Sequence, residues 1–222
     1  MKERLDRLLL EQGLTASREK ARAEIMAGNV YVNGQREDKP GSTFDPEKVK
    51  IELKSRGLRY VSRGGLKLEK AVDVFGPKLS GCTCLDIGAS TGGFTDCLLQ
   101  AGAARVASVD VGYGDLAWRL RQDERVSVFE RTNIRTADPT ALGAPFDLVV
   151  ADLSFIGLAR LAPVFAGLCR PGSAFIGLVK PQFESRHGET DDKGVVRDEL
   201  VRLRTVREVE EALVSAGFQP RG

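Results

Sequence analysis

The sequence CLDIGASTGGFTDCLL, residues Cys84–Leu99, decides the fold of this chain. It joins a short apolar run, typical of a buried strand, to a glycine-rich turn and then to a helix-like segment. Glycine allows a positive φ and lets backbone approach a ligand closely, and a helix that begins after such a turn offers free N–H groups to a polar partner. The stretch therefore predicts a strand, turn and helix that hold a ligand.

The residues that follow repeat this alternation of strand and helix. Strands that read as continuous apolar runs between helices are typical of a parallel sheet covered on both faces. We therefore expect an α/β fold with a Rossmann-like, doubly wound sheet and helices on both faces. Strands are expected at 82–87, 105–110, 126–129, 147–151 and 174–179, and helices at 62–76, 93–101, 115–121, 157–168 and 198–216. Gly217 and Phe218 read as the entry to another strand, so we expect the C-terminal strands of the sheet to be missing from this sequence.

The first residues predict a separate, small α+β domain. A short amphipathic helix ends at Gly13, and Ser17 can cap a second helix over 18–27. Asn33-Gly34 is a strong hairpin-turn signal, and residues 48–53 alternate as a strand does. We expect the small domain over 1–58, a linker over 59–62 and the larger domain over 63–222.

Charge is distributed unevenly along the chain. Residues 1–70 contain 16 Lys and Arg against 11 Asp and Glu, a net charge of +5, whereas residues 71–222 contain 17 against 20, a net charge of −3. A basic front indicates contact with a polyanion, although many solvated helices show the same balance.

Composition excludes several other classes of protein. The four cysteines and the single histidine, His187, do not form a zinc-binding spacing, so we expect no metal site. The longest apolar stretch, 155–169, is interrupted by Arg160 and Pro163 and is too short to span a bilayer. With no signal peptide recognised at the start, we expect a cytoplasmic protein that does not bind a membrane.

The glycine-rich turn favours a particular ligand. The order Gly88, Ser90, Gly92, Gly93 does not match the G-x-G-x-x-G fingerprint of dinucleotide-binding proteins. Asp86 can bind an ammonium or hydroxyl group, and Asp110, at the tip of the next strand, can accept both ribose hydroxyls of an adenosine. A cationic adenosyl ligand, S-adenosyl-L-methionine, suits this set; the alternative is a scaffold whose glycines serve only tight turns.

The later motifs strengthen this interpretation. GASTGGFTDCLL, VDVGYGDLAW, ERTNIR, VVADLSFI and LVKPQFE resemble, in order, the motifs of the TlyA (hemolysin A) family of rRNA methyltransferases, which is related to the FtsJ-like 2′-O-methyltransferases. ASREKARAEIMAGNVYVNG resembles the RNA-binding module named after the fourth small-subunit ribosomal protein. The resemblance implies S-adenosylmethionine-dependent methylation of a ribose 2′-hydroxyl, with ribosomal RNA or a ribosomal subunit as substrate.

The resemblance also implies which residues act. Lys67, Asp152 and Lys180 match the first three members of a Lys-Asp-Lys-Glu tetrad, with Lys180 as the base, Lys67 tuning it and binding RNA, and Asp152 orienting the ammonium groups. The fourth member, a glutamate, is not identified in this sequence. Glu184 is a conceivable substitute, but we expect Glu184 to be an acid in a mobile loop. The cofactor site is expected to comprise Asp86, Gly88, Ala89, Ser90, Thr91, Gly92, Gly93, Phe94, Asp110, Val111, Asn133 and Asp152. RNA contacts are expected from Arg4, Arg7, Arg18, Lys20, Arg22, Arg63 and Lys67.

Other features are assigned less specific roles. Trp118 is expected to pack in the core or against a helix, although the family motif places it near the adenine side of the cofactor. Residues 184–196 form a polar loop that can cover the site as a lid. Two other functions remain open: an RNA-binding protein whose methyltransferase domain no longer turns over, and a membrane-lysing toxin. The absence of a spanning segment or a strongly amphipathic helix argues against the toxin.

Overall fold

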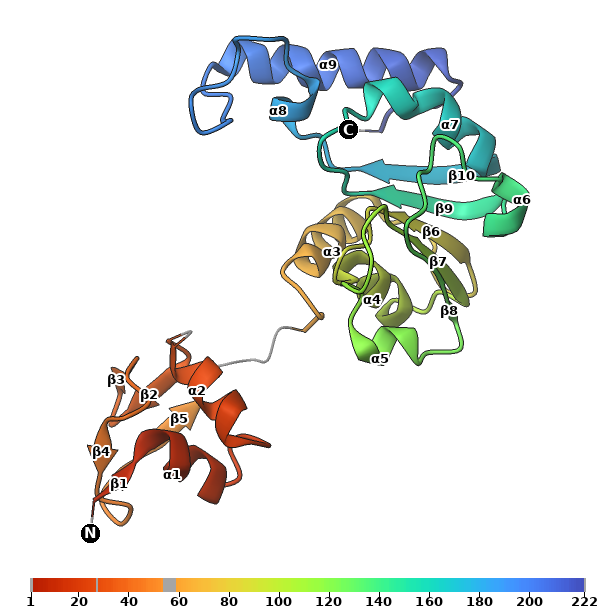
Figure 1. The fold of residues 1–222 in the computed structure, drawn as a ribbon. Helices are drawn as coiled ribbons and strands as arrows, with labels where there is room; N and C mark the ends of the chain where they lie inside the picture. Colours follow the sequence, from red (N-terminus) through yellow and green to blue (C-terminus); the bar gives the residue numbers. More distant parts are fainter. Residues whose placement is uncertain (1, 27, 54–58, 222) are drawn as a thin grey trace. The chain divides into compact units, whose positions relative to one another are not determined.

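The computed structural model describes residues 2–26, 28–53 and 59–221, and the chain divides into two compact units, Met1–Arg59 and Tyr60–Gly222 (Figure 1). In the N-terminal unit, the described residues form two helices and two small antiparallel sheets. Its elements are β1 (Glu3–Arg4), α1 (Leu5–Glu11), α2 (Arg18–Met26), β2 (Val30–Val32), β3 (Gln35–Arg36), β4 (Thr43–Phe44) and β5 (Ile51–Leu53). The strands pair as β1-β4 and as β3-β2-β5.

Local sequence signals explain the elements of the N-terminal unit. Ser17 Oγ accepts a hydrogen bond from the Lys20 N–H at 3.2 Å, which confirms the predicted helix cap. Asn33 and Gly34 both have positive φ and connect β2 to β3, as the hairpin signal predicts. The last strand is shorter than expected because the N–H groups of Lys48 and Val49 form a turn with the Asp45 carbonyl.

The C-terminal unit is built on a five-stranded parallel sheet, which confirms the predicted α/β fold. The strands are β6 (Thr83–Ile87), β7 (Arg105–Val109), β8 (Val126–Phe129), β9 (Phe146–Ala151) and β10 (Cys169–Gly177), in the spatial order β10-β9-β6-β7-β8. Side chains alternate across the sheet: Cys84 and Val150 enter one core, and Leu85 and Val149 enter the other. Because both faces are buried, the strands read as continuous apolar runs.

Helices cover both faces of this sheet (Figure 1). On one face lie α3 (Gly64–Phe75), α4 (Gly93–Gln100) and α5 (Trp118–Arg121). The other face is covered by α6 (Pro139–Leu142), the 3₁₀ turn η1 (Ala159–Leu161), α7 (Ala162–Leu168) and α9 (Glu199–Ser215), while α8 (Pro181–Glu184) follows β10. The continuous helix expected over 157–168 is therefore divided, with Pro163 in the first turn of α7.

Two further expectations are corrected. The helix expected at 115–121 begins only at Trp118, and the Trp118 side chain is 74% exposed rather than packed in the core. β10 begins before the predicted residue 174, because Cys169 already pairs with Phe146; an irregular register then separates that pair from the regular pairing that starts at Ala174.

The C-terminal unit begins with residues that pack tightly. Tyr60 is buried against Gly65, where an added Cβ would lie 2.3 Å from the Tyr60 ring. The Val61 N–H donates to Asp96 Oδ2 on α4 at 2.7 Å. Within the predicted linker 59–62, these two residues thus belong to the packed C-terminal unit. Residues 54–58, predicted to form the end of the small domain, lie outside the described residues.

Membrane-spanning helices and metal-binding clusters are both absent from the part of the chain that the structure describes. Among the described helices, none combines the length and apolar character needed to cross a bilayer. Across residues 2–26, 28–53 and 59–221, no group of three or more His, Cys, Asp or Glu side chains is arranged to hold a metal ion.

Candidate active site

The carboxyl ends of β6, β7 and β9 meet at the switch point of the sheet. From β6 the chain continues outward to β7 and β8, then crosses back to β9 and β10 on the other side. The turns are joined by backbone hydrogen bonds: Gly88 N donates to the Val109 carbonyl at 2.8 Å, and Asp152 N donates to the Ile87 carbonyl at 3.1 Å. A doubly wound sheet binds ligands at this edge.

The glycine-rich turn after β6 requires its glycines. Gly88 and Gly92 have φ values of +85° and +92°, and Ser90 also has a positive φ. A Cβ on Gly88 would lie 2.7 Å from the Asp152 carbonyl oxygen, so the turn passes directly over the end of β9. The turn is thus held against the end of β9 in a conformation that side chains disfavour.

Asp110 connects the turns that follow β6 and β7. Its Oδ2 accepts from the Ser90 N–H at 2.8 Å, and its Oδ1 accepts from the Gly112 N–H at 2.7 Å. Carboxylate oxygens retain further acceptor positions when each receives one bond. A small pocket adjoins this carboxylate, lined by Ala89, Ser90, Ser108, Asp110, Gly112, Asp115, Leu116, Val128 and Glu130. The arrangement suits the predicted ribose contact of Asp110.

The Asp86 side chain is completely buried. An acid that binds an ammonium group at the protein surface would have to face solvent, and Asp86 does not. Its Oδ2 accepts from the Thr95 N–H at 2.9 Å and from Thr95 Oγ1 at 2.7 Å, which fixes the first turn of α4. Its Oδ1 has no hydrogen-bond partner among the described residues. Burial raises the pKa of Asp86 to about 7. The Thr95 hydrogen bonds act in the opposite direction, and the nearby Asp152 and Asp110 carboxylates add to the rise.

We expect the Asp86→Asn substitution to reduce the pH dependence of stability. With a pKa near 3.8 unfolded and about 7 folded, Asp86 binds its proton more tightly in the fold, so the free energy of unfolding falls as pH rises between these values. The slope for one such group is about 1.4 kcal/mol per pH unit. Denaturant titrations at pH 5 and pH 8 should show a smaller difference for the variant; equal differences in the variant and the wild type would contradict this assignment.

Lys67, Asp152 and Lys180 lie together, although they come from α3 and from the ends of β9 and β10. Lys180 Nζ lies 2.6 Å from Asp152 Oδ1, and Lys67 Nζ lies 3.4 Å from Asp152 Oδ2. The Lys180 and Asp152 side chains are each 19% exposed, whereas Lys67 is 51% exposed. One carboxylate thus holds two cations, one sheltered and one open to solvent.

Glu184 anchors the segment that follows Lys180. Its Oε1 accepts from the Leu158 N–H at 2.5 Å, and a Cβ on Gly157 would collide with Glu184 Oε2 at 2.3 Å. Burial raises the pKa of Glu184, while the hydrogen bonds from backbone N–H groups lower it. The expectation of an acid in a mobile loop is wrong, since this carboxylate joins α8 to the loop after β9.

The remaining cofactor candidates differ in exposure. Ala89 and Gly92 in the turn are buried, as are Gly93 and Phe94 at the start of α4, whereas Thr91 is exposed. Val111 is 70% exposed after β7. The Asn133 side-chain oxygen accepts from the Arg135 N–H at 3.0 Å and shapes the turn after β8.

Sequence reasoning missed a stacked pair at the same edge of the sheet. The Arg131 guanidinium lies 4.2 Å from the centre of the Tyr113 ring, and Tyr113 is 67% exposed. Arg131 has a positive φ of 51°, which is uncommon for a residue other than glycine. Both residues lie within motifs quoted for the family resemblance, but only the fold brings the two turns together.

The polar segment 184–196 is anchored to α9. Arg204 donates from Nη1 and Nη2 to the two Glu189 carboxylate oxygens, at 2.8 and 2.5 Å. This pairing lowers the pKa of Glu189 to about 2. Arg197 donates to Asp191 at 2.7 Å, and His187 is exposed. The Glu189–Arg204 pair ties the segment to α9, and its role as a lid stays a prediction.

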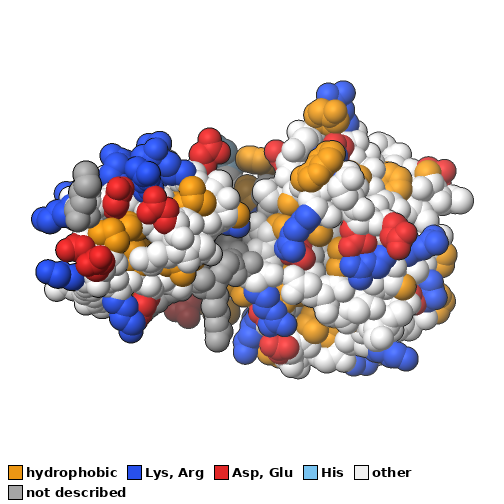
Figure 2. Space-filling view, turned by 90° about the horizontal axis from the view of Figure 1, so that it is seen from below, with side chains coloured by type: hydrophobic (Ala, Val, Ile, Leu, Met, Phe, Trp, Pro, Cys, Tyr) orange, Lys and Arg blue, Asp and Glu red, His pale blue; other side chains and the backbone are white. Residues whose placement is uncertain are grey.

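The predicted RNA contacts of the N-terminal unit fall into two groups. Arg4 and Arg18 both donate to the buried Asp6 carboxylate, at 3.0 and 3.1 Å, and the Arg4 hydrogen bond is the main cause of the lowered pKa of Asp6. Arg7 donates to Glu11 at 2.9 Å. Lys20 and Arg22 are exposed on α2, as is Arg63 before α3 in the C-terminal unit. Figure 2 shows Lys and Arg side chains gathered on the N-terminal unit.

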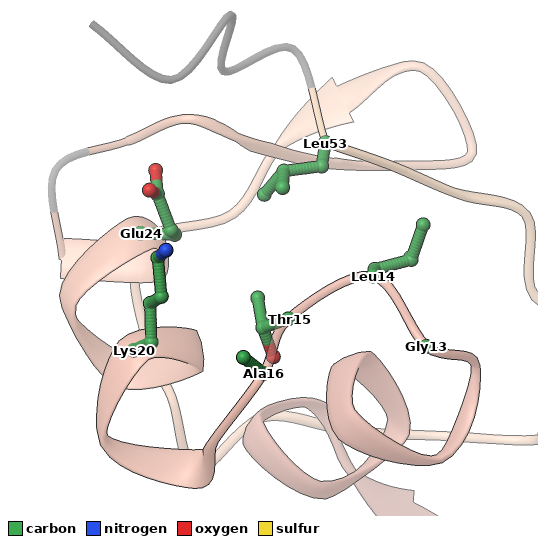
Figure 3. Close-up of a pocket in the computed structure, with 7 residues that line it drawn as sticks. All are labelled: Gly13, Leu14, Thr15, Ala16, Lys20, Glu24 and Leu53. Carbon is green, nitrogen blue, oxygen red and sulfur yellow. The ribbon is translucent and has the colours of Figure 1, made fainter.

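A hollow lies beside Lys20 in the N-terminal unit. It has a volume of about 300 Å³ and is enclosed by the α1–α2 loop, α2 and the end of β5 (Figure 3). Leu14 and Leu53 form its apolar side, and Lys20 and Glu24 lie together on the other. Lys20 therefore borders both this hollow and the exposed face of α2.

Comparisons with known proteins match the whole chain. The family model described as FtsJ-like methyltransferase matches residues 60–222, and the S4 domain model matches residues 3–49. The chain is 43% identical to the 16S/23S rRNA (cytidine-2′-O)-methyltransferase TlyA of Mycobacterium tuberculosis, over 99% of this chain and 82% of the relative. It is 37% identical to Hemolysin A of Brachyspira hyodysenteriae, over 97% and 90%. A Streptococcus thermophilus structure that carries a hemolysin name superposes with a TM-score of 0.75 at 43% identity, over 100% of this chain and 81% of that one.

Proposed function

We infer that this chain, which belongs to the FtsJ-like methyltransferase family, transfers a methyl group from S-adenosylmethionine to a ribose 2′-hydroxyl of ribosomal RNA. The observation that carries this inference is the juxtaposition of Lys67, Asp152 and Lys180 at the switch point, next to the glycine-rich turn. Its relative TlyA bears the name of a cytidine-2′-O-methyltransferase acting on 16S and 23S rRNA.

The residues at the switch point fit S-adenosylmethionine. Gly88 allows the turn to approach the end of β9 more closely than a Cβ would permit, and Asp110 retains acceptor capacity for ribose hydroxyls. When bound, S-adenosylmethionine supplies an electrophilic methyl group. We propose that Gly88, Asp110 and the residues of the turn between them hold it.

Lys180 is placed to accept the proton of the substrate 2′-hydroxyl. A ribose 2′-hydroxyl is a weak nucleophile until its proton is removed or shared. The methyl–sulfur bond of the donor would break with its electron pair left on sulfur, the 2′ oxygen would gain the methyl carbon and lose its O–H bond, and the neutral Lys180 amine would take up the proton. The Asp152 carboxylate, 2.6 Å from Lys180 Nζ, stabilises the ammonium that results. The chain thus contributes a proton acceptor and holds the reacting groups in a fixed arrangement.

Lys67 contributes its charge from the solvent side. Its ammonium shares Asp152 with Lys180 but remains about half exposed, so it can also contact a phosphate of the bound RNA. It also provides a second cation that shares the Asp152 carboxylate with Lys180. We therefore propose that Lys67 binds RNA and tunes Lys180, and that Lys180 accepts the proton.

The exposed cations of α2 are proposed to contact RNA phosphates. We expect the double variant Lys20→Ala/Arg22→Ala to bind ribosomal RNA more weakly, because cations that bind phosphate release counterions from the nucleic acid. The slope of log affinity against log salt concentration should decrease by about 0.7–0.9 for each phosphate that is no longer neutralised. Filter binding at several salt concentrations measures both effects, with Lys78→Ala, on the C-terminal unit, as the control. An unchanged slope would contradict this surface.

A transfer assay tests the proposed function. The full chain is incubated with methyl-labelled S-adenosylmethionine and ribosomal subunits, and the RNA is then digested to nucleosides. Label on a ribose 2′ oxygen supports the proposal. Cofactor and RNA binding without transfer would instead identify an RNA-binding protein that has lost turnover, and label on a base would reject the ribose assignment.

A further inference from the structure

The Lys180 ammonium is directed by Ser154, a neighbour to which the family resemblance assigns no role. Its contact with Asp152 Oδ1 is an ion pair at 2.6 Å, but that oxygen lacks a partner with hydrogen-bond geometry among the described residues. Lys180 Nζ does donate a hydrogen bond to Ser154 Oγ, at 3.1 Å. Charge attraction has little directional preference, whereas a hydrogen bond depends steeply on angle. Asp152 therefore attracts the ammonium and Ser154 orients it.

Three contacts join the loop that carries Ser154 to the segment that carries Lys180. Besides the Ser154–Lys180 hydrogen bond, the Phe155 and Phe183 rings lie 5.6 Å apart, and Leu158 N donates to Glu184. These contacts occur in the same order along both segments. The loop after β9 and the segment after β10 are thus fastened to each other beside the two charged side chains.

The backbone next to Ser154 is also strained. Phe155 has a φ of +68° and a side chain that is 93% exposed. A bulky residue is uncommon in the left-handed region and persists there only where surrounding contacts maintain it. Here the strained turn comes immediately after the residue whose hydroxyl meets Lys180, which accords with a loop shaped by the position of Ser154.

We propose that Ser154 is a positioning residue for Lys180: its hydroxyl fixes the direction of Nζ, so that the lone pair of the neutral amine faces the substrate hydroxyl. The proposal rests on the proposed function. By accepting one N–H, Ser154 leaves the lone pair directed away from itself, and by accepting from the ammonium it stabilises the protonated product of proton transfer. Ser154 itself undergoes no covalent change.

The variant Ser154→Ala removes the hydroxyl and little else from an exposed position. We expect kcat for methyl transfer to fall about tenfold, since a hydrogen bond to a charged group is removed, while KM for S-adenosylmethionine and for RNA is unchanged. The acidic limb of the pH–rate profile should move to lower pH, because the ammonium loses an acceptor. Ser154→Thr should restore most of the rate and the position of the limb.

Ser185→Ala is the matched control, because the Ser185 hydroxyl bonds the nearby Gln182 carbonyl instead of Lys180. Its kcat and pH profile should equal those of the wild type. Cofactor affinity and melting temperature, measured on each variant, separate misfolding from a loss of positioning. A Ser154→Ala variant with wild-type kcat and pH profile, or no rescue by threonine in a folded protein, overturns the role of Ser154 alone. A wild type that does not methylate ribose overturns the proposed function as well.

Discussion

Replacing Lys180 by alanine lowers kcat for methyl transfer by about 10²–10⁴-fold, the range that a positioned general base contributes. Binding of S-adenosylmethionine should change little, because Lys180 faces Asp152 and Ser154 and does not belong to the glycine-rich turn. Single-turnover transfer of labelled methyl groups to ribosomal subunits measures the rate, and calorimetric titration measures cofactor binding. The loss should therefore appear in kcat with both substrates saturating.

The control for Lys180 is a lysine of equal size outside the site. Lys70 is exposed on α3, the same helix as Lys67, and Lys70→Ala should retain the wild-type rate. Lys180→Arg keeps the positive charge but cannot act as a base near neutral pH, so it should be as impaired as Lys180→Ala. An active arginine variant would show that Lys180 contributes charge alone, and full activity of Lys180→Ala would remove it from the mechanism.

Substituting Gly88 by alanine should affect both cofactor binding and stability. The added Cβ meets the Asp152 carbonyl oxygen at 2.7 Å, and the φ of +85° disfavours any side chain. We expect the free energy of unfolding to fall by about 2 kcal/mol or more, combining backbone strain with a close approach that forces the end of β9 to move. Affinity for S-adenosylmethionine should fall at least about tenfold, because the turn and Asp152 move together.

Gly143 provides a matched control for this substitution. It has a φ of +94°, close to that of Gly88, but no atom lies within 4 Å of its added Cβ. Gly143→Ala should therefore lose only the stability due to strain and should bind S-adenosylmethionine as the wild type does. Denaturant titration and calorimetry of both variants test the comparison. Equal cofactor affinity in the two variants would show that the close approach at Gly88 does not shape the site.

The sheet could be predicted because its strands are buried on both faces. β6, β7, β8 and β9 lie within a residue or so of the ranges expected from their apolar runs. β10 departs further, since the pairing of Cys169 with Phe146 depends on a tertiary register that local sequence does not encode. The exposure of Trp118 could not be predicted from the sequence either. Large aromatic residues are usually well buried, and only the path of the folded chain determines whether this one is.

The three charged residues of the site could be identified because two of them end strands, and strand ends share one edge in a doubly wound sheet. Lys67 was identified through the family resemblance alone. Ser154 and Glu184 were missed as structural partners, because their contacts depend on how the loop after β9 meets the segment after β10. The burial of Asp86 likewise follows from the packing of α4 on the sheet, which places Thr95 over its carboxylate.

The position of the transferred methyl group tests the account most directly. Ribosomal RNA is treated with the full chain and S-adenosylmethionine, digested to nucleosides and analysed by mass spectrometry, with Lys180→Ala treated in parallel. We expect a 2′-O-methylated nucleoside with the wild type and a large loss of that product with the variant. A methyl group found on a base, or equal yields of product from the two proteins, would contradict it.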